Sequence, residues 1–145
     1  MLFRSIGGNL NIQNLNQATT TLELSASEGT VGVNNMGDLT VKQLISSGAV
    51  SLRSNMGSIR LQRVVNDGRL RLTTPQGSVY SMPDSDVRLN QLQLFSGGDV
   101  SLNPNELDLI SGHVGGNLEL ILTGTGPTRL ANDQLPLLKI GRAHV

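Results

Sequence analysis

The sequence predicts an all-β fold, a right-handed parallel β-helix (β-solenoid) with about 20 residues per coil. Glycine spacing is the first observation: Gly37, Gly57 and Gly77 are 20 residues apart, and Gly48 and Gly68 repeat at the same interval. The second is that apolar and polar residues alternate after each of these glycines, which is typical of strands with one buried face. The third observation is that no stretch of the sequence sustains the spacing of apolar residues that a helix requires.

Each coil is expected to consist of a long arm and a short arm, both opened by glycine. The long arm reads G-D-L-T-V-K-Q-L-I-S-S from Gly37 and G-S-I-R-L-Q-R-V-V-N-D from Gly57. The short arm reads G-A-V-S-L-R-S-N-M from Gly48 and G-R-L-R-L-T-T-P-Q from Gly68. Such a unit cannot bury its own apolar face, but copies stacked on one another close a continuous core. We expect the glycines to supply positive φ at the corners.

The alternation also assigns the residues that face inward. Residues at equivalent positions of successive arms should stack as ladders inside the coil, with those of the short arm on the opposite wall. The predicted ladders are Leu39 with Ile59 and Val79, Val41 with Leu61, Val50 with Leu70, and Leu52 with Leu72. Ser81 is a misfit in the second of these ladders.

The repeat divides the chain into segments. Residues 1–6 are read as the start of a fragment, and residues 7–126 as β-helix repeats. Within these, residues 82–96 keep the alternation but lose the glycine, so we expect an irregular corner there. Residues 127–139 are read as a terminal loop or the next partial coil.

The last six residues break the pattern. They read I-G-R-A-H-V, which is the translation of ATC GGA AGA GCA CAC GTC, codons that resemble a common short-read sequencing adapter. Our hypothesis is that residues 140–145 are adapter read-through, the alternative being an ordinary ragged C-terminus. The nucleotide sequence tests this, since any other codons would end the idea.

Composition excludes several classes of protein. Eleven basic and eleven acidic side chains cancel, so the chain lacks the positive field that generic binding to nucleic acid or anionic membranes requires. The absence of cysteine excludes a disulfide framework and thiolate metal sites. No run of 18 apolar residues is present, so no membrane-spanning helix is expected. The opening residues lack the charged lead and apolar run of an export signal, so we expect that any such signal lies outside this stretch or does not exist.

The G-x-L-x-V and G-x-V-x-L units at Gly37, Gly48, Gly57, Gly68 and Gly98 carry a family resemblance. In coils of this length they resemble the repeat region of filamentous haemagglutinin-type exoproteins. The resemblance implies a stalk segment of a large bacterial surface or secreted adhesin, of the two-partner-secretion or the autotransporter-like type, located at the cell surface or outside the cell. The implied partners are neighbouring coils of the full-length chain and surface glycans or proteins.

An enzyme is the alternative, because polysaccharide lyases and hydrolases also use β-helices and need carboxylates clustered on an outer face. Asp84 and Asp86 form one close pair, which we interpret as part of a turn. Glu106 and Asp108 form another, which we interpret as solvated. With only three aromatic residues in the chain, an adhesive segment without catalysis is favoured over a fragment of such an enzyme.

Cofactor and metal sites are not predicted. His113 has no second histidine at metal-ligand spacing and is interpreted as a surface-loop residue. The glycines around Asp99 lack the tandem nine-residue copies of a calcium-binding repeat. Gly124 and Gly126 are followed by neither lysine nor helix, so a phosphate-binding loop is not expected.

Arginines in the middle of the chain are the remaining candidates for binding. Arg60, Arg69 and Arg71 fall on outward positions of the alternation, so they are expected to project into solvent. If they form one patch, it would suit acidic or sulfated glycans. The alternative is that they only keep the rod soluble and discourage pairing of strand edges.

Overall fold

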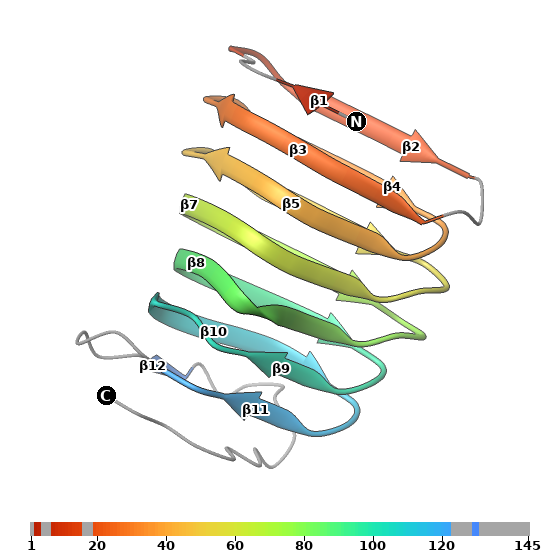
Figure 1. The fold of residues 1–145 in the computed structure, drawn as a ribbon, viewed down its shortest axis with the longest axis vertical. Coiled ribbons are helices and arrows are strands. Elements are labelled where there is room, and N and C mark those ends of the chain that lie inside the picture. The colour runs from red at the N-terminus through yellow and green to blue at the C-terminus, as the bar shows by residue number, and fades with distance from the viewer. Residues whose placement is uncertain (1, 4–6, 16–18, 123–128, 131–145) are drawn as a thin grey trace.

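The computed structural model describes residues 2–3, 7–15, 19–122 and 129–130 as a stack of coils built from parallel strands (Figure 1). In chain order the strands are β1 (Leu2–Phe3), β2 (Leu10–Asn14), β3 (Thr20–Ser27), β4 (Val31–Asn35), β5 (Leu39–Ser46), β6 (Val50–Ser54), β7 (Ile59–Thr74), β8 (Val79–Ser96), β9 (Val100–Leu102), β10 (Glu106–Val114), β11 (Leu118–Leu120) and β12 (Arg129–Leu130). The predicted β-solenoid with about 20 residues per coil is confirmed. None of these segments is a helix of the length and hydrophobicity that crossing a bilayer requires.

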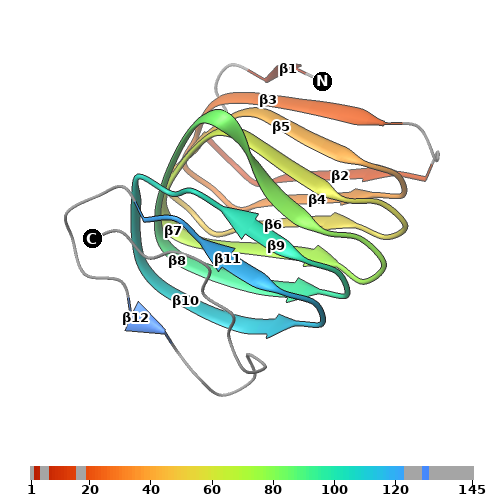
Figure 2. The same cartoon turned by 60° about the horizontal axis from the view of Figure 1, so that its bottom comes forward.

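Three walls run along the stack, and each takes one segment from successive coils. Wall A stacks residues 20–22, 39–41, 59–61, 79–81, 100–102 and 118–120. Wall B stacks residues 2–3, 23–27, 43–46, 63–66, 86–89 and 106–107. Wall C stacks residues 10–14, 31–35, 50–54, 70–74, 92–96 and 110–114. Walls A and C face each other across a flattened core, as Figure 2 shows for β3 and β5 opposite β4 and β6.

The core includes all of the predicted inward ladders. Leu39, Ile59 and Val79 are in register on wall A, and each is fully buried. The ladders Val41 with Leu61, Val50 with Leu70, and Leu52 with Leu72 are confirmed as well. Each buried aliphatic side chain contributes about 1.5–3 kcal/mol relative to exposure, so the ladders are the main stabilising feature of the fold.

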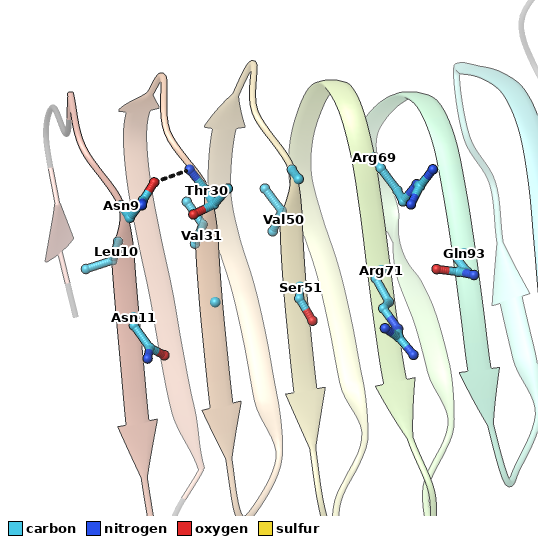
Figure 3. Close-up of a pocket in the computed structure, with 12 residues that line it drawn as sticks. Asn9, Leu10, Asn11, Thr30, Val31, Val50, Ser51, Arg69, Arg71 and Gln93 are labelled. Atoms are coloured by element: carbon cyan, nitrogen blue, oxygen red, sulfur yellow. Dashed lines mark hydrogen bonds between the residues drawn. The ribbon is translucent and has the colours of Figure 1, made fainter.

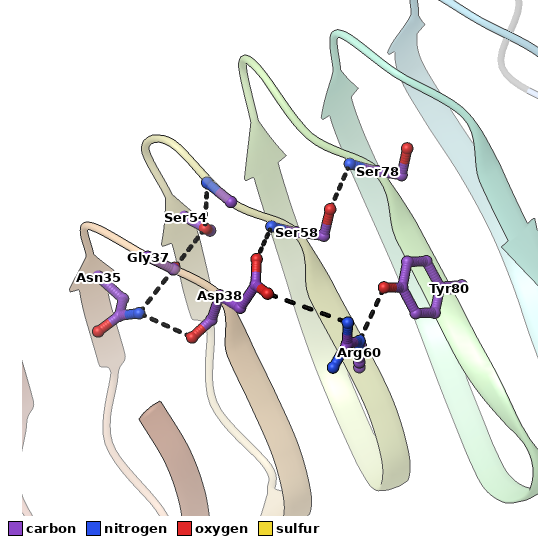
Figure 4. Close-up of polar contacts among 9 residues, drawn as sticks. Asn35, Gly37, Asp38, Ser54, Ser58, Arg60, Ser78 and Tyr80 are labelled. Carbon is purple, nitrogen blue, oxygen red and sulfur yellow. Dashed lines mark hydrogen bonds and ion pairs between the residues drawn. The ribbon is translucent and has the colours of Figure 1, made fainter. Parts of the chain in front are cut away.

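A ladder of side-chain oxygens joins the coils at the corner that precedes wall A (Figure 4). The oxygen of one coil accepts a hydrogen bond from the backbone N–H at the equivalent position of the next. The four bonds run from Ser58 N to Asp38 Oδ1 at 2.8 Å, Ser78 N to Ser58 Oγ at 2.9 Å, Asp99 N to Ser78 Oγ at 3.0 Å, and Asn117 N to Asp99 Oδ1 at 2.8 Å. These bonds satisfy backbone donors that no strand ladder reaches.

The corner glycines are required for a different reason from the one expected. Among the described glycines, positive φ occurs only at Gly112. The expectation that the corner glycines have positive φ is therefore wrong. Instead, a Cβ on Gly48, Gly68 or Gly77 would come closer than 3.0 Å to the carbonyl oxygen of the glycine one coil earlier. These corners therefore need glycine because successive coils approach each other closely.

The structure has a register shift inside residues 82–96. Between walls A and B, one residue separates Leu61 from Arg63, whereas the four residues 82–85 separate Ser81 from Asp86 in the next coil. The extra residues are part of β8, and Pro83 and Asp84 are exposed. Beyond the shift Leu92 is back in register with Leu70. The insertion is thus accommodated within one coil.

The C-terminal segment is described only in part. Leu109 and Ile110 of β10 pair in parallel with Arg129 and Leu130 of β12 on wall C. Residues 140–145, with the adapter hypothesis, lie outside the described residues.

Candidate functional site: the outward face of wall C

The outward face of wall C is polar and carries three arginines. Alternation along each strand sends every second side chain outward, and the parallel register stacks these side chains in rows. The registered outward residues are Asn11, Gln13, Gly32, Asn34, Ser51, Arg53, Arg69, Arg71, Thr73, Gln91, Gln93, Phe95, Leu109, Ser111 and His113. These positions include no acidic residue, so the face has a local positive charge although the chain as a whole is neutral.

The three arginines are exposed, and none of them forms a salt bridge with another described residue. The guanidinium of Arg71 lies over the ring of Phe95, 4.8 Å from its centroid, which holds the side chain against the face. Nε of Arg53 donates a hydrogen bond to Oδ1 of Asn55. Within the described part of the chain, the salt bridges involve Lys42, Arg60 and Arg88. Arg53, Arg69 and Arg71 therefore have no salt-bridge partner among the described residues.

Arg60 does not belong to this face, so the three predicted arginines do not form one patch. It lies on wall A, in register with Thr40 and Tyr80, whereas Arg69 and Arg71 lie on wall C across the core. Its Nε donates a hydrogen bond to the Tyr80 hydroxyl at 2.7 Å, and its Nη2 is 3.9 Å from Oδ2 of Asp38. The bond to Tyr80 is the main reason that the pKa of Arg60 is raised above its ordinary value. Arg60 thus stabilises contacts between coils.

Arg53 is the arginine that sequence reasoning did not include in the patch. It lies on β6 of wall C, and its neighbours in register are Asn34 and Thr73. The signal was present in the repeat, because Arg53, Arg69 and Arg71 all belong to short arms whereas Arg60 belongs to a long arm. Sorting the arginines by arm would have placed them on the correct walls.

A trough of about 530 Å³ crosses this face (Figure 3). Its floor is formed by small residues of β4 and β6 and the corners before them: Thr30, Gly32, Ala49 and Ser51. One edge carries Asn9 and Asn11, and the other carries Arg69, Arg71 and Gln93. Two strands with small outward side chains between strands with large ones therefore create the depression.

No family model, curated protein or solved structure matches this chain. The functional assignment consequently depends on the chemistry of the surfaces themselves.

One member of each acidic pair, Asp86 and Glu106, lies beside Arg88. Oδ1 of Asp86 accepts hydrogen bonds from Nε of Arg88 at 3.0 Å and from Nδ2 of Asn105 at 2.7 Å. The bond from Arg88 is the main reason that the pKa of Asp86 is lowered. Nη1 of Arg88 is also 3.4 Å from Oε1 of Glu106. A carboxylate held ionised in this way is poorly suited to act as a general acid.

The remaining acidic members of these pairs and His113 are exposed. Asp84 lies on the inserted residues of β8, and Asp108 lies on β10. His113 is in strand β10, in register with Phe95, so its interpretation as a loop residue is wrong. No group of three or more His, Asp or Glu side chains with the geometry of a metal site occurs in the described ranges.

Proposed function

We propose that this chain is a structural and adhesive stalk segment of a large bacterial surface or secreted exoprotein, which binds anionic glycans through the outward face of wall C. The observation that carries the proposal is the set of three arginines, Arg53, Arg69 and Arg71, on a face whose registered outward positions hold no acid. Guanidinium groups form paired hydrogen bonds with carboxylates and sulfates. Amide and hydroxyl side chains around them can bind sugar hydroxyls.

The architecture supports a stalk. Each coil contributes the same walls, so coils added at either end would lengthen the rod without altering the existing ones. A single face with three exposed arginines binds weakly, because surface charges are screened beyond about 8 Å at physiological ionic strength. Repetition of such faces along a longer rod would raise the overall affinity through multivalency.

Retention on a heparin column, measured against salt, tests the proposal. The triple variant with Arg53, Arg69 and Arg71 changed to Ser should lose most of the retention at low salt. Its circular dichroism should stay that of a β-protein, because all three side chains point outward. The matched control is Arg60→Ser, which removes a cation from wall A and should elute like the unmodified chain. Equal retention of the triple variant and the unmodified chain would refute the proposed binding face.

A further inference from the structure

We infer that the trough on wall C is the binding site for one acidic sugar unit of a linear polysaccharide. The inference rests on the proposed function and deepens it, because it assigns the binding to a defined site with a defined orientation. A hexuronate or a sulfated hexose has the required chemistry, an anionic group at one side of the ring and hydroxyls at the other.

The two edges of the trough differ in the way that such a sugar requires. Arg69 and Arg71 are two residues apart on one strand, about 6.6 Å. Because the guanidinium of Arg71 lies over Phe95 of the next coil, Arg69 is the arginine assigned to bind the carboxylate or sulfate, and Arg71 adds positive charge beside it. Asn9 and Asn11 lie on the opposite edge, three strand spacings away, about 14 Å. Oδ1 of Asn9 accepts a hydrogen bond from Thr30 N at 3.1 Å, which orients the amide and leaves its N–H groups for a hydroxyl oxygen.

Gly32 is the observation that separates a site from a chance depression. At the corner glycines Gly29, Gly48 and Gly68, a Cβ would clash with the coil before, so the fold itself requires glycine there. At Gly32 the nearest atom to an added Cβ would be Asn11 Oδ1 at 3.6 Å, an ordinary contact, and φ is not positive. Coil packing therefore does not require glycine at position 32, and its effect is to keep the floor of the trough open.

The trough is blocked at one end and open at the other. Along β4 and β6 the next outward residues are Asn34 and Arg53, which are large and are tied together through Asn55. At the other end the floor runs out to the corner at Gly29 and Gly48. The proposed occupant is therefore a terminal unit of the polysaccharide chain, which has a single glycosidic link that can leave through the open end. The volume of about 530 Å³ is in the range of small-ligand sites.

Filling the floor without changing any charge tests the inference. Gly32→Phe places an aromatic ring on the floor at a strand position that favours aromatic residues. Ala49→Phe fills the neighbouring position and guards against a folding defect in the first variant. The matched control is Ser101→Phe, which adds the same ring at an exposed outward position of wall A. Binding of a fluorescent chondroitin sulfate hexasaccharide is measured by anisotropy, and thermal midpoints are measured in parallel.

The inference requires both floor variants to weaken binding about tenfold or more, while Ser101→Phe stays within about twofold of the unmodified chain. All three variants should keep a thermal midpoint close to that of the unmodified chain. If both floor variants bind as the unmodified chain does, while replacement of the arginines abolishes binding, the assignment of the site to the trough is overturned. The proposal that the outward face of wall C binds glycans would then still hold. No binding by the unmodified chain would overturn the proposed function and the trough together. Loss of binding only alongside a loss of folding in both floor variants would also overturn the assignment.

Discussion

The hydroxyl of Tyr80 accepts a hydrogen bond from Nε of Arg60, and this 2.7 Å contact joins two successive coils of wall A. The guanidinium carbon of Arg60 also lies 5.4 Å from the centroid of the Tyr80 ring. Both contacts are with a residue one coil later in the stack, as the register of β7 and β8 requires. An outward arginine can therefore serve the stack itself instead of a ligand, and position in the register distinguishes the two roles.

Replacement of Arg60 by Ser should lower stability without affecting binding. Loss of the contacts with Tyr80 is expected to reduce the free energy of unfolding by about 0.5–1 kcal/mol, the usual value of an exposed cation–π contact. Urea unfolding followed by circular dichroism measures the change. Arg69→Ser is the companion variant, for which we expect unchanged stability and reduced heparin retention. A reversal of the two patterns would show that the walls have been assigned to the wrong roles.

Neighbouring residues of β7 should respond in opposite ways to the same substitution. Leu70 is fully buried, so Leu70→Asp places a carboxylate in the core and should cost several kcal/mol or abolish folding. Arg71 is exposed, so Arg71→Asp should cost about 1 kcal/mol or less, mainly through the lost contact with Phe95. Thermal unfolding of the two variants provides the comparison. Similar losses in both would contradict the alternation of inward and outward residues.

Glycine substitutions should separate positions where the coils need close approach from positions where they do not. Gly77→Ala puts a methyl group against the carbonyl oxygen of Gly57, and because the obstacle is backbone we expect a loss of about 2 kcal/mol or more. Gly32→Ala has room for its methyl group and should raise stability by about 0.4–1 kcal/mol, since alanine reduces the entropy of the unfolded chain. Denaturant midpoints measure both changes. Equal destabilisation would refute the steric explanation of the corner glycines.

The Asp86–Arg88 contact predicts a stability contribution that depends on pH. The pKa of Asp86 is lowered in the folded chain, mainly by the hydrogen bond from Arg88. The contact therefore contributes fully above the ordinary aspartate pKa of about 3.9 and loses its contribution as pH falls through the lowered folded value. Asp86→Asn should be less stable than the unmodified chain at pH 7, and the difference should shrink below about pH 4. Thermal midpoints across this range provide the measurement, and a difference independent of pH would contradict the ionised contact.

The sequence predicts the inside of this molecule better than its outside. One repeat length and one alternation are enough to determine the ladder of Leu39, Ile59 and Val79, because a shift of one residue would turn these buried side chains to the outside. The outer surface depends on which wall each arm occupies and on side-chain volumes in adjacent coils. Neither the contact of Arg71 with Phe95 nor the trough around Gly32 follows from the repeat alone, because coil length varies and the rows form only in the folded register.

The ladder of corner oxygens has a consequence for how genes encoding such rods change in length. Asp38, Ser58 and Ser78 play the same part in successive coils, each oxygen accepting from the N–H one coil later. Deletion of residues 39–58 would bring Ser78 N onto Asp38 Oδ1 in place of Ser58 Oγ and would join Asp38 directly to Ile59, the counterpart of Leu39. Unequal recombination between repeats can thus remove or duplicate whole coils and still leave every remaining corner with its acceptor.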